Sequence, residues 1–375
     1  MDTAKQGIGL RNVVAGESAL SSIDGERGVL AYRGIDIHAL AEQSTFEEVV
    51  FLLHRGRLPG RAELADFIQA LARERSVPPP AVSLLGLLPA STHPMTSLRT
   101  LVSALGAFDP DGNDDTPPAV ARKALRLTAQ MATLVALIDR TRKGKPPVPP
   151  DPGLSHAANF LYMLTGERPR PEAERAMDVA LILHADHEFN ASTFAARVAA
   201  STLADIHGAI TAALATLKGP LHGGANEAVM KMLEEIGTPD RAEVWVREAL
   251  AAKKKVMGFG HAVYRTEDPR ATHLRRMSRQ LGEARDERRW YETSERVEAL
   301  VRALKGLNAN VDFYSASVYH SLGIPTDLFT PVFAVSRVAG WTAHVLEQLS
   351  NNRLIRPESE YTGPRDVPYV PLTER

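Results

Sequence analysis

The chain has 375 residues, of which 44% are hydrophobic, 24% charged and 6% aromatic, a composition typical of globular proteins. It holds 44 Lys and Arg against 45 Asp and Glu, so it lacks the basic excess of a general nucleic-acid binder. The absence of cysteine excludes disulfides, thiolate metal sites and a cysteine nucleophile.

The longest uncharged apolar stretches, Ala81–Ala90 and Leu127–Ile138, are shorter than the roughly 20 residues that a membrane-spanning helix requires. Residues 1–12 lack the apolar core of a signal peptide. We therefore expect a soluble, cytoplasmic protein with neither a membrane nor a nucleic acid as partner.

In chain order, a strand signal at Leu20–Tyr32 comes first, with Asp24-Gly25 suited to turning a short hairpin. Helical periodicity then dominates, starting with Ser44–Gly56, where Thr45 and Glu48 have capping-box spacing. The further predicted helices are Arg61–Arg75, Thr96–Phe108, Ala119–Arg142, Ser155–Thr165, Pro171–Asp186, Ser192–Leu217, Ala225–Ile236, Arg241–Lys254, Pro269–Arg285, Asp286–Lys305, Val311–Leu322 and Pro331–Leu349. No fixed repeat of 20–50 residues is visible, which weighs against a solenoid. The pattern predicts an all-α fold.

The unusual chemistry lies in residues 184–356. In His184-Ala-Asp186-His187-Glu188, two histidines stand three positions apart near a predicted helix end, beside two carboxylates. These side chains could bind a metal ion, cap the helix, or contact a substrate through a histidine. Metal binding is disfavoured because neither the HExxH nor the HxxEH order is present.

A further histidine, His222, stands in Gly-Pro-Leu-His-Gly-Gly just before the predicted helix Ala225–Ile236. The positive potential of a helix N-terminus favours a neutral imidazole that donates a hydrogen bond. The simpler alternative is a histidine in a tight turn. Further on, Lys253–Lys255 lead into a glycine-containing loop that ends in His261, a combination suited to phosphate binding. A lysine run is also typical of a solvated helix end.

Asp312 lies in the first turn of the predicted helix Val311–Leu322. Such a carboxylate either stabilises the helix terminus or, where burial raises its pKa from about 3.9, acts as a general base. Arg337 interrupts an apolar helix and Arg356 lies in Ile-Arg-Pro, and such arginines either extend to solvent or pair with an anion. Together these residues indicate one pocket for a small di- or tricarboxylate and carbanion chemistry.

Taken together, the motifs resemble the citrate synthase family over nearly the whole chain. Eight segments occur in the order found in that family: GERGVLAYRGIDIHALAEQSTFEEVVFLL, HPMTSLRT, HADHEFNAST, GPLHGGANE, GFGHAVYRTEDPRA, NVDFYSASVYHSLGIP, VSRVAGWTAH and IRPESEYTG. Each has moderate specificity, and their order makes a chance likeness very improbable.

The resemblance implies a role for each candidate. His222 would hydrogen-bond the enol or enolate oxygen of acetyl-CoA, His261 would polarise and protonate the oxaloacetate carbonyl, and Asp312 would remove the methyl proton. The residues that match oxaloacetate ligands are His187, Arg270, Arg337 and Arg356, the last reaching in from the other subunit of a homodimer. The residues that match the coenzyme A contact are Lys255, Val256, Met257, Gly258, Phe259 and Gly260. Coenzyme A thioester is then a substrate, and no metal or permanently bound cofactor is expected.

The resemblance also implies a large helical domain from residues 1–222 and 321–375, a smaller one from 223–320, and a site in the cleft between them. Two positions depart from the family pattern. Ala262 stands where the family often has an arginine, and Glu358 stands where a second arginine often follows Arg356-Pro.

Three other functions remain open. The first is 2-methylcitrate synthase, in which propionyl-CoA uses the same residues, because one methylene is worth only about 1–3 kcal/mol in a pocket. The second is a metal-dependent hydrolase built on His184, Asp186, His187 and Glu188. The third is a helical scaffold without enzymatic activity.

Overall fold

The computed structural model describes residues 8–10 and 13–375. Within these residues there are sixteen α-helices and one sheet of three short strands, which confirms the predicted all-α class. No helix in the described ranges is both long and apolar enough to cross a bilayer.

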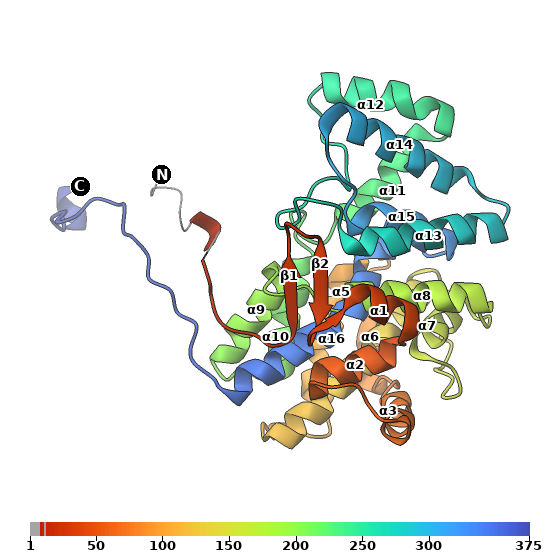
Figure 1. Cartoon of the computed structure of the whole chain (residues 1–375). Coiled ribbons are helices and arrows are strands. Elements are labelled where there is room, and N and C mark those ends of the chain that lie inside the picture. The colour runs from red at the N-terminus through yellow and green to blue at the C-terminus, as the bar shows by residue number, and fades with distance from the viewer. Residues whose placement is uncertain (1–7, 11–12) are drawn as a thin grey trace.

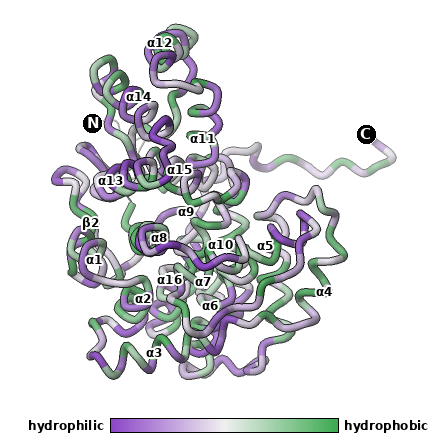
Figure 2. The backbone as a smooth tube through the Cα atoms, turned by 90° about the vertical axis from the view of Figure 1, so that its right-hand side faces the viewer, coloured by the Kyte–Doolittle hydropathy of each residue, from purple (hydrophilic) through white to green (hydrophobic). Residues whose placement is uncertain are grey.

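The helices form two groups, one above the other in both views (Figures 1 and 2), that are in contact with each other. The upper lobe, residues 225–321, comprises α11 (Ala225–Ile236), α12 (Ala242–Ala251), α13 (Pro269–Ala284), α14 (Arg289–Lys305) and α15 (Val311–Ser321). The lower body comprises α1 (Ile37–Gln43), α2 (Phe46–Arg55), α3 (Arg61–Arg73), α4 (Pro79–Leu87), α5 (Pro94–Phe108), α6 (Pro117–Arg142), α7 (His156–Thr165), α8 (Pro171–His184), α9 (Ala191–Ser201), α10 (Ile206–Leu217) and α16 (Phe329–Ser350). After α16 the chain runs away from both groups in either view.

The two longest helices, α6 and α16, pack against each other in the lower body. Most of α16 is buried around its whole circumference, including Arg337 and His344 at 2% and 0% exposure. Buried polar groups need hydrogen-bond partners, so these two side chains must find theirs inside the molecule.

The predicted hairpin is confirmed as β1 (Ser21–Asp24) and β2 (Val29–Tyr32), with β3 (Ile35–Asp36) as an additional strand. Its tip reaches the upper lobe, because Arg265 donates its backbone N–H to the carbonyl of Gly25 at 2.9 Å. A Cβ at Gly25 would lie 2.4 Å from the carbonyl oxygen of Val263, so this close approach requires glycine. The hairpin thus supports the loop that follows His261.

The single helix predicted over Ser192–Leu217 is wrong. The chain breaks it into α9 and α10 at Leu203, whose φ is +64°, and Asp205 then caps α10 by accepting the N–H of Gly208. Helices α1 and α4 were not predicted: α1 has only seven residues, and α4 begins with two prolines that resemble a loop in sequence.

Candidate active site

Six of the seven side chains predicted for catalysis and oxaloacetate binding lie together where the upper lobe meets the lower body. They are His187, His222, His261, Arg270, Asp312 and Arg337. The positive charge of Arg270, of Arg337 or of both lowers the pKa of each of the other four side chains, in addition to the effect of burial. Each of the four therefore lies within electrostatic range of at least one of the two arginines. Neighbouring elements from both parts of the molecule therefore build one cluster.

His187 and His261 face each other across this junction, with ring centroids 5.3 Å apart. Burial lowers the pKa of His261 to about 4, and burial likewise holds the pKa of His187 well below its usual range. The Nδ1 of His261 accepts the backbone N–H groups of Val263 and Tyr264 at 3.1 and 3.3 Å. The neutral ring of His261 therefore carries its hydrogen on Nε2, where it can be donated.

Arg270 forms a bidentate pair with Asp268, with N–O distances of 2.9 and 2.8 Å, and both side chains are buried. Asp268 caps α13 and also accepts the backbone N–H of Val311 at 3.1 Å, so it joins the starts of α13 and α15. The pair uses Nε and Nη2 of Arg270, and its Nη1 has no hydrogen-bond partner among the described residues. That group is left for an anion.

Arg337 donates from Nε to the carbonyl of His184 at 2.6 Å and lies over the ring of Phe333 at 4.6 Å. Burial lowers its pKa to about 10, so it remains charged at neutral pH. Its two Nη groups have no partner within residues 8–10 and 13–375. A buried charge of this kind is stabilised by binding an anion.

Asp312 begins α15, where the side chain of Asn310 accepts its backbone N–H at 3.1 Å. Its own carboxylate has no hydrogen-bond partner in the described part of the chain. Burial and the nearby charge of Asp268 raise the pKa of Asp312 to about 6, although Arg270 and Arg337 oppose the shift. The carboxylate is thus available as a base near neutral pH.

His222 precedes α11, and its Nε2 lies 2.8 Å from the hydroxyl of Ser192 and 3.3 Å from the backbone N–H of the same residue. An N–H can only donate, so Nε2 is the acceptor and the neutral ring carries its hydrogen on Nδ1. Burial lowers the pKa of His222 to about 4, with help from Arg337. Trp341 donates from Nε1 to the same hydroxyl at 3.1 Å, which holds Ser192 in place.

The loop predicted to contact coenzyme A is joined to the start of α15. Asn310 donates its backbone N–H to the carbonyl of Gly258 and its side chain to that of Gly260, both at 2.9 Å. Gly258 has φ +83°, and a Cβ there would lie 2.8 Å from Phe313. Lys255 is exposed, whereas Val256 and Phe259 pack in the hydrophobic core. Val256 and Phe259 would therefore contact a ligand through their backbone. The side chain of Met257 is half-buried.

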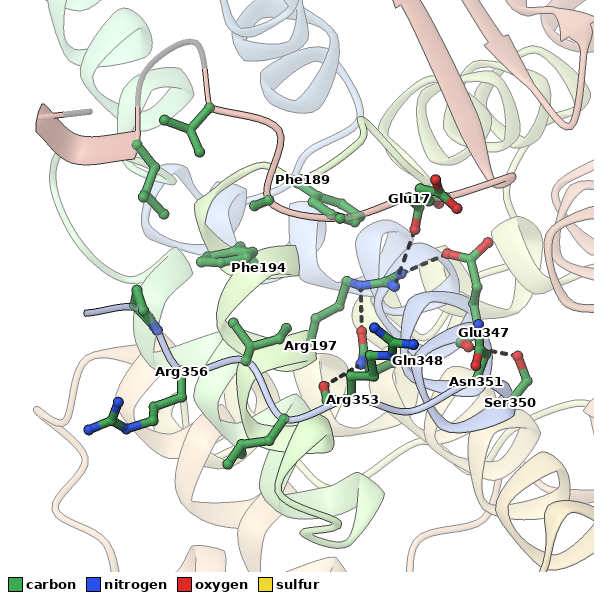
Figure 3. Close-up of a pocket in the computed structure, with 18 of the residues that line it drawn as sticks. Glu17, Phe189, Phe194, Arg197, Glu347, Gln348, Ser350, Asn351, Arg353 and Arg356 are labelled. Atoms are coloured by element: carbon green, nitrogen blue, oxygen red, sulfur yellow. Dashed lines mark hydrogen bonds and ion pairs between the residues drawn. The ribbon is translucent and has the colours of Figure 1, made fainter. Parts of the chain in front are cut away.

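Arg356 does not join the cluster of its own chain. It is exposed and lines a separate pocket of about 1020 Å³ between the segment that precedes β1 and the end of α16. Figure 3 shows Arg197 within this pocket, bound to Glu347 and Gln348, while the guanidinium of Arg356 points away from them.

The metal site considered for residues 184–188 is not supported, and neither is the hydrolase built on it. His184 Nδ1 donates to the carbonyl of Ala180, Asp186 binds Ser21 and His344, and Glu188 accepts the N–H of Ile23. These side chains therefore have different partners instead of converging. The described residues contain no group of three or more His, Cys, Asp or Glu that is arranged to hold a metal ion.

Three residues of the site were missed by sequence reasoning: Ser192, Tyr264 and Asp268. Asp268 had a signal, since an aspartate before Pro269 is a typical helix cap. Ser192 and Tyr264 had none, because their partners His222 and His187 lie 30 and 77 positions away.

Comparisons with known proteins agree with this geometry. Residues 9–358 match the family model described as "Citrate synthase, C-terminal domain". The chain is 53% identical to "Citrate synthase 2" of Bacillus subtilis, with 98% of each chain covered. It is 46% identical to a 2-methylcitrate synthase of Mycobacterium tuberculosis, with 95% of this chain and 90% of the relative covered. It is also similar to the solved structure of the citrate synthase of Thermoplasma acidophilum in ternary complex with carboxymethyl coenzyme A and oxaloacetate, with a TM-score of 0.91 and 36% identity over 98% of this chain and 99% of that one.

Proposed function

Since the chain belongs to the citrate synthase family of condensing acyltransferases, we propose that it joins acetyl-CoA to oxaloacetate, with water, to give citrate and free coenzyme A. The observation that carries the proposal is the Asp312 carboxylate near Arg270 and Arg337, three groups that keep hydrogen-bonding atoms without a partner among the residues that the structure describes. A base next to two anion-binding groups suits proton removal from a thioester in the presence of a dicarboxylate. The two ligands named for the Thermoplasma protein support the same pair of substrates.

In the first step, Asp312 takes a proton from the methyl group of acetyl-CoA. The negative charge moves to the thioester oxygen, where Nδ1–H of His222 stabilises it by a hydrogen bond. A neutral imidazole suits this role, because the pKa of His222 at about 4 keeps it uncharged at pH 7.

In the second step, the enol carbon attacks the keto carbon of oxaloacetate. Arg270 and Arg337 bind the carboxylates, and His187 adds a third contact. His261 donates from Nε2 to the keto oxygen and protonates it as the carbon–carbon bond forms. Transfer of the proton that Asp312 gained from the methyl group then restores the neutral ring of His261 and the carboxylate of Asp312. Water then hydrolyses the thioester and releases coenzyme A.

The exposed Lys255 and the backbone of 256–260 are the proposed contacts for coenzyme A. The proposal includes a small domain of residues 223–320 and a large domain of 1–222 with 321–375, and the grouping of helices into an upper lobe and a lower body supports it. Their closure would exclude water and bring Asp312 to the methyl group. The hydrogen bonds between this loop and Asn310 would transmit coenzyme A binding to the base.

A cytoplasmic homodimer is also part of the proposal. Arg356 is exposed on a tail that leaves the body of its own chain, which suits a residue that completes the site of a partner subunit. A guanidinium supplied there would bind one oxaloacetate carboxylate, a contact worth roughly 1.5–3 kcal/mol.

The test is release of free thiol from acetyl-CoA and from propionyl-CoA in the presence of oxaloacetate. We expect release from acetyl-CoA at a higher kcat/KM. Faster turnover of propionyl-CoA would assign the chain to the 2-methylcitrate reaction instead, as its Mycobacterium tuberculosis relative suggests. Absence of thiol release from both would reject the condensation, while a preparation without oxaloacetate controls for simple thioester hydrolysis.

A further inference from the structure

The turn that follows α8 is held by one face of α16. Arg337, Gly340 and His344 stand at positions i, i+3 and i+7, so they lie on the same side of that helix. Arg337 donates from Nε to the carbonyl of His184 at 2.6 Å, and Gly340 donates its backbone N–H to that of Ala185 at 3.1 Å. A Cβ at Gly340 would overlap the same carbonyl oxygen, so this close approach requires glycine. The backbone of the turn is therefore fixed against α16.

His344 makes the third contact of this face, with the carboxylate of Asp186. Its Nε2 lies 3.2 and 3.3 Å from the two carboxylate oxygens, and both side chains are fully buried. At the other ring nitrogen, Nη1 of Arg197 lies 3.1 Å from Nδ1. An arginine N–H can only donate, so Nδ1 is the acceptor and the ring donates from Nε2 to Asp186. Ser21 is a second donor to this carboxylate, with its hydroxyl 2.6 Å from Oδ2.

We propose that Asp186 is a positioning residue for the binding of oxaloacetate. It directly precedes His187, and its partner His344 lies seven positions after Arg337 on the same face of α16. One buried contact thus fixes two oxaloacetate-binding side chains relative to each other, and Asp186 acts through them without touching the substrate. The inference rests on the proposed function, because it takes His187 and Arg337 as ligands of oxaloacetate. Groups that are held in place before a ligand arrives bind it more tightly, because less ordering is needed on binding.

The test is calorimetric titration of oxaloacetate into the wild type and His344→Leu, which removes both hydrogen bonds of the ring and keeps the position filled. We expect the Kd for oxaloacetate to rise about three- to ten-fold, because Asp186 loses one of its two side-chain donors. The KM for oxaloacetate should rise by the same factor in steady-state assays. The kcat and the KM for acetyl-CoA should stay within about twofold of the wild type, since the base and the coenzyme A contacts are untouched.

Two further variants separate positioning from packing. His344→Gln can still accept from Arg197 and donate to Asp186, so its Kd should return towards the wild-type value. His156→Leu is the matched control, because it makes the same exchange at a fully buried histidine of the lower body whose ring nitrogens have no partner among the described residues. Its Kd for oxaloacetate should equal that of the wild type.

An unchanged Kd in His344→Leu would overturn the proposal, and so would a Kd in His344→Gln as high as in His344→Leu, which would assign the loss to packing. An equal rise in His156→Leu would overturn it by showing that any buried histidine has this effect. If His344→Leu does not fold, Ser21→Ala removes the other donor from a half-buried position and should raise the Kd about two- to five-fold. An unchanged Kd in Ser21→Ala would then overturn the proposal. Failure of the wild type to bind oxaloacetate would instead reject the proposed function.

Discussion

At Asp312, burial raises the pKa to about 6, and the carboxylate has no hydrogen-bond partner within residues 8–10 and 13–375. The ionised form is the base, so kcat/KM should be full above this pKa and fall about tenfold per pH unit below it. The pH–rate profile between pH 5 and 8, with activity rechecked after return to pH 7, measures this. A profile that stays flat down to pH 5 would exclude a base with this pKa.

His222 should be neutral at pH 7, because burial and Arg337 lower its pKa to about 4. A titration followed by NMR on the folded protein measures its protonation, and the resonance that disappears in His222→Asn identifies the ring. We expect no protonation of this ring down to pH 5. An imidazolium at neutral pH would contradict hydrogen-bond donation by a neutral His222.

Single residue types could be recognised from sequence, but their partners could not. A histidine followed by two glycines, an aspartate in a first helical turn and an arginine in an apolar helix are each unusual, so His222, Asp312 and Arg337 could be identified. The tautomer of His222 is set by Ser192, a tertiary contact 30 positions away that follows no spacing rule. The tautomer of His261 is set locally, by the backbone N–H groups two and three positions further along its own loop. Of the predicted oxaloacetate ligands, only Arg356 lies apart from the cluster.

At the scale of elements, helix starts marked by a proline, a preceding glycine or a capping side chain were predictable, as at Arg61, Pro171 and Ala225. Thr45 accepts the N–H of Glu48 as its spacing predicted. The break at Leu203 was missed because neither glycine nor proline marks it and apolar residues continue on both sides. Asp205 was the available signal, as an aspartate that could cap a second helix.

One contact between elements makes stability depend on pH. His38 on α1 and His273 on α13 hydrogen-bond through Nδ1 and Nε2 at 2.7 Å, between the lower body and the upper lobe. Burial, with His38 and Arg276, lowers the pKa of His273 to about 4, against the opposing charges of Glu42 and Asp36. His273 takes up a proton near pH 6.5 in the unfolded chain but only near pH 4 in the folded protein. The contribution of His273 to the free energy of unfolding is therefore complete above pH 6.5 and is lost as the pH falls towards 4.

We therefore expect His273→Gln to flatten the decrease in the free energy of unfolding between pH 6.5 and 4. Urea denaturation at several pH values measures the slope in both proteins. The wild type retains other buried histidines whose pKa values are lowered, such as His156, so its slope includes their contribution and only the difference is assigned to His273. Equal slopes would show that His273 is protonated in the folded protein.

For the whole molecule, the prediction is that two subunits share each site. Arg356→Ala should weaken oxaloacetate binding and leave the proposed dimer intact, because the side chain is exposed in its own chain and its removal leaves no cavity there. Mixing Arg356→Ala subunits with Asp312→Asn subunits gives dimers in which one site carries both defects and the other neither. Activity should reappear on mixing. If subunit exchange is verified with tagged chains and no activity returns, the site is not shared.

The most direct test of the proposed mechanism is the turnover of Asp312→Asn with acetyl-CoA, measured together with its affinity for oxaloacetate. Asparagine keeps the size of the side chain and removes the base, so kcat should fall at least about 100-fold while oxaloacetate binding stays nearly unchanged. Asp240→Asn makes the same exchange at an exposed position of the upper lobe and should behave as the wild type. Turnover near the wild-type value, or a loss of oxaloacetate binding as large as the loss of turnover, would show that Asp312 is not the base.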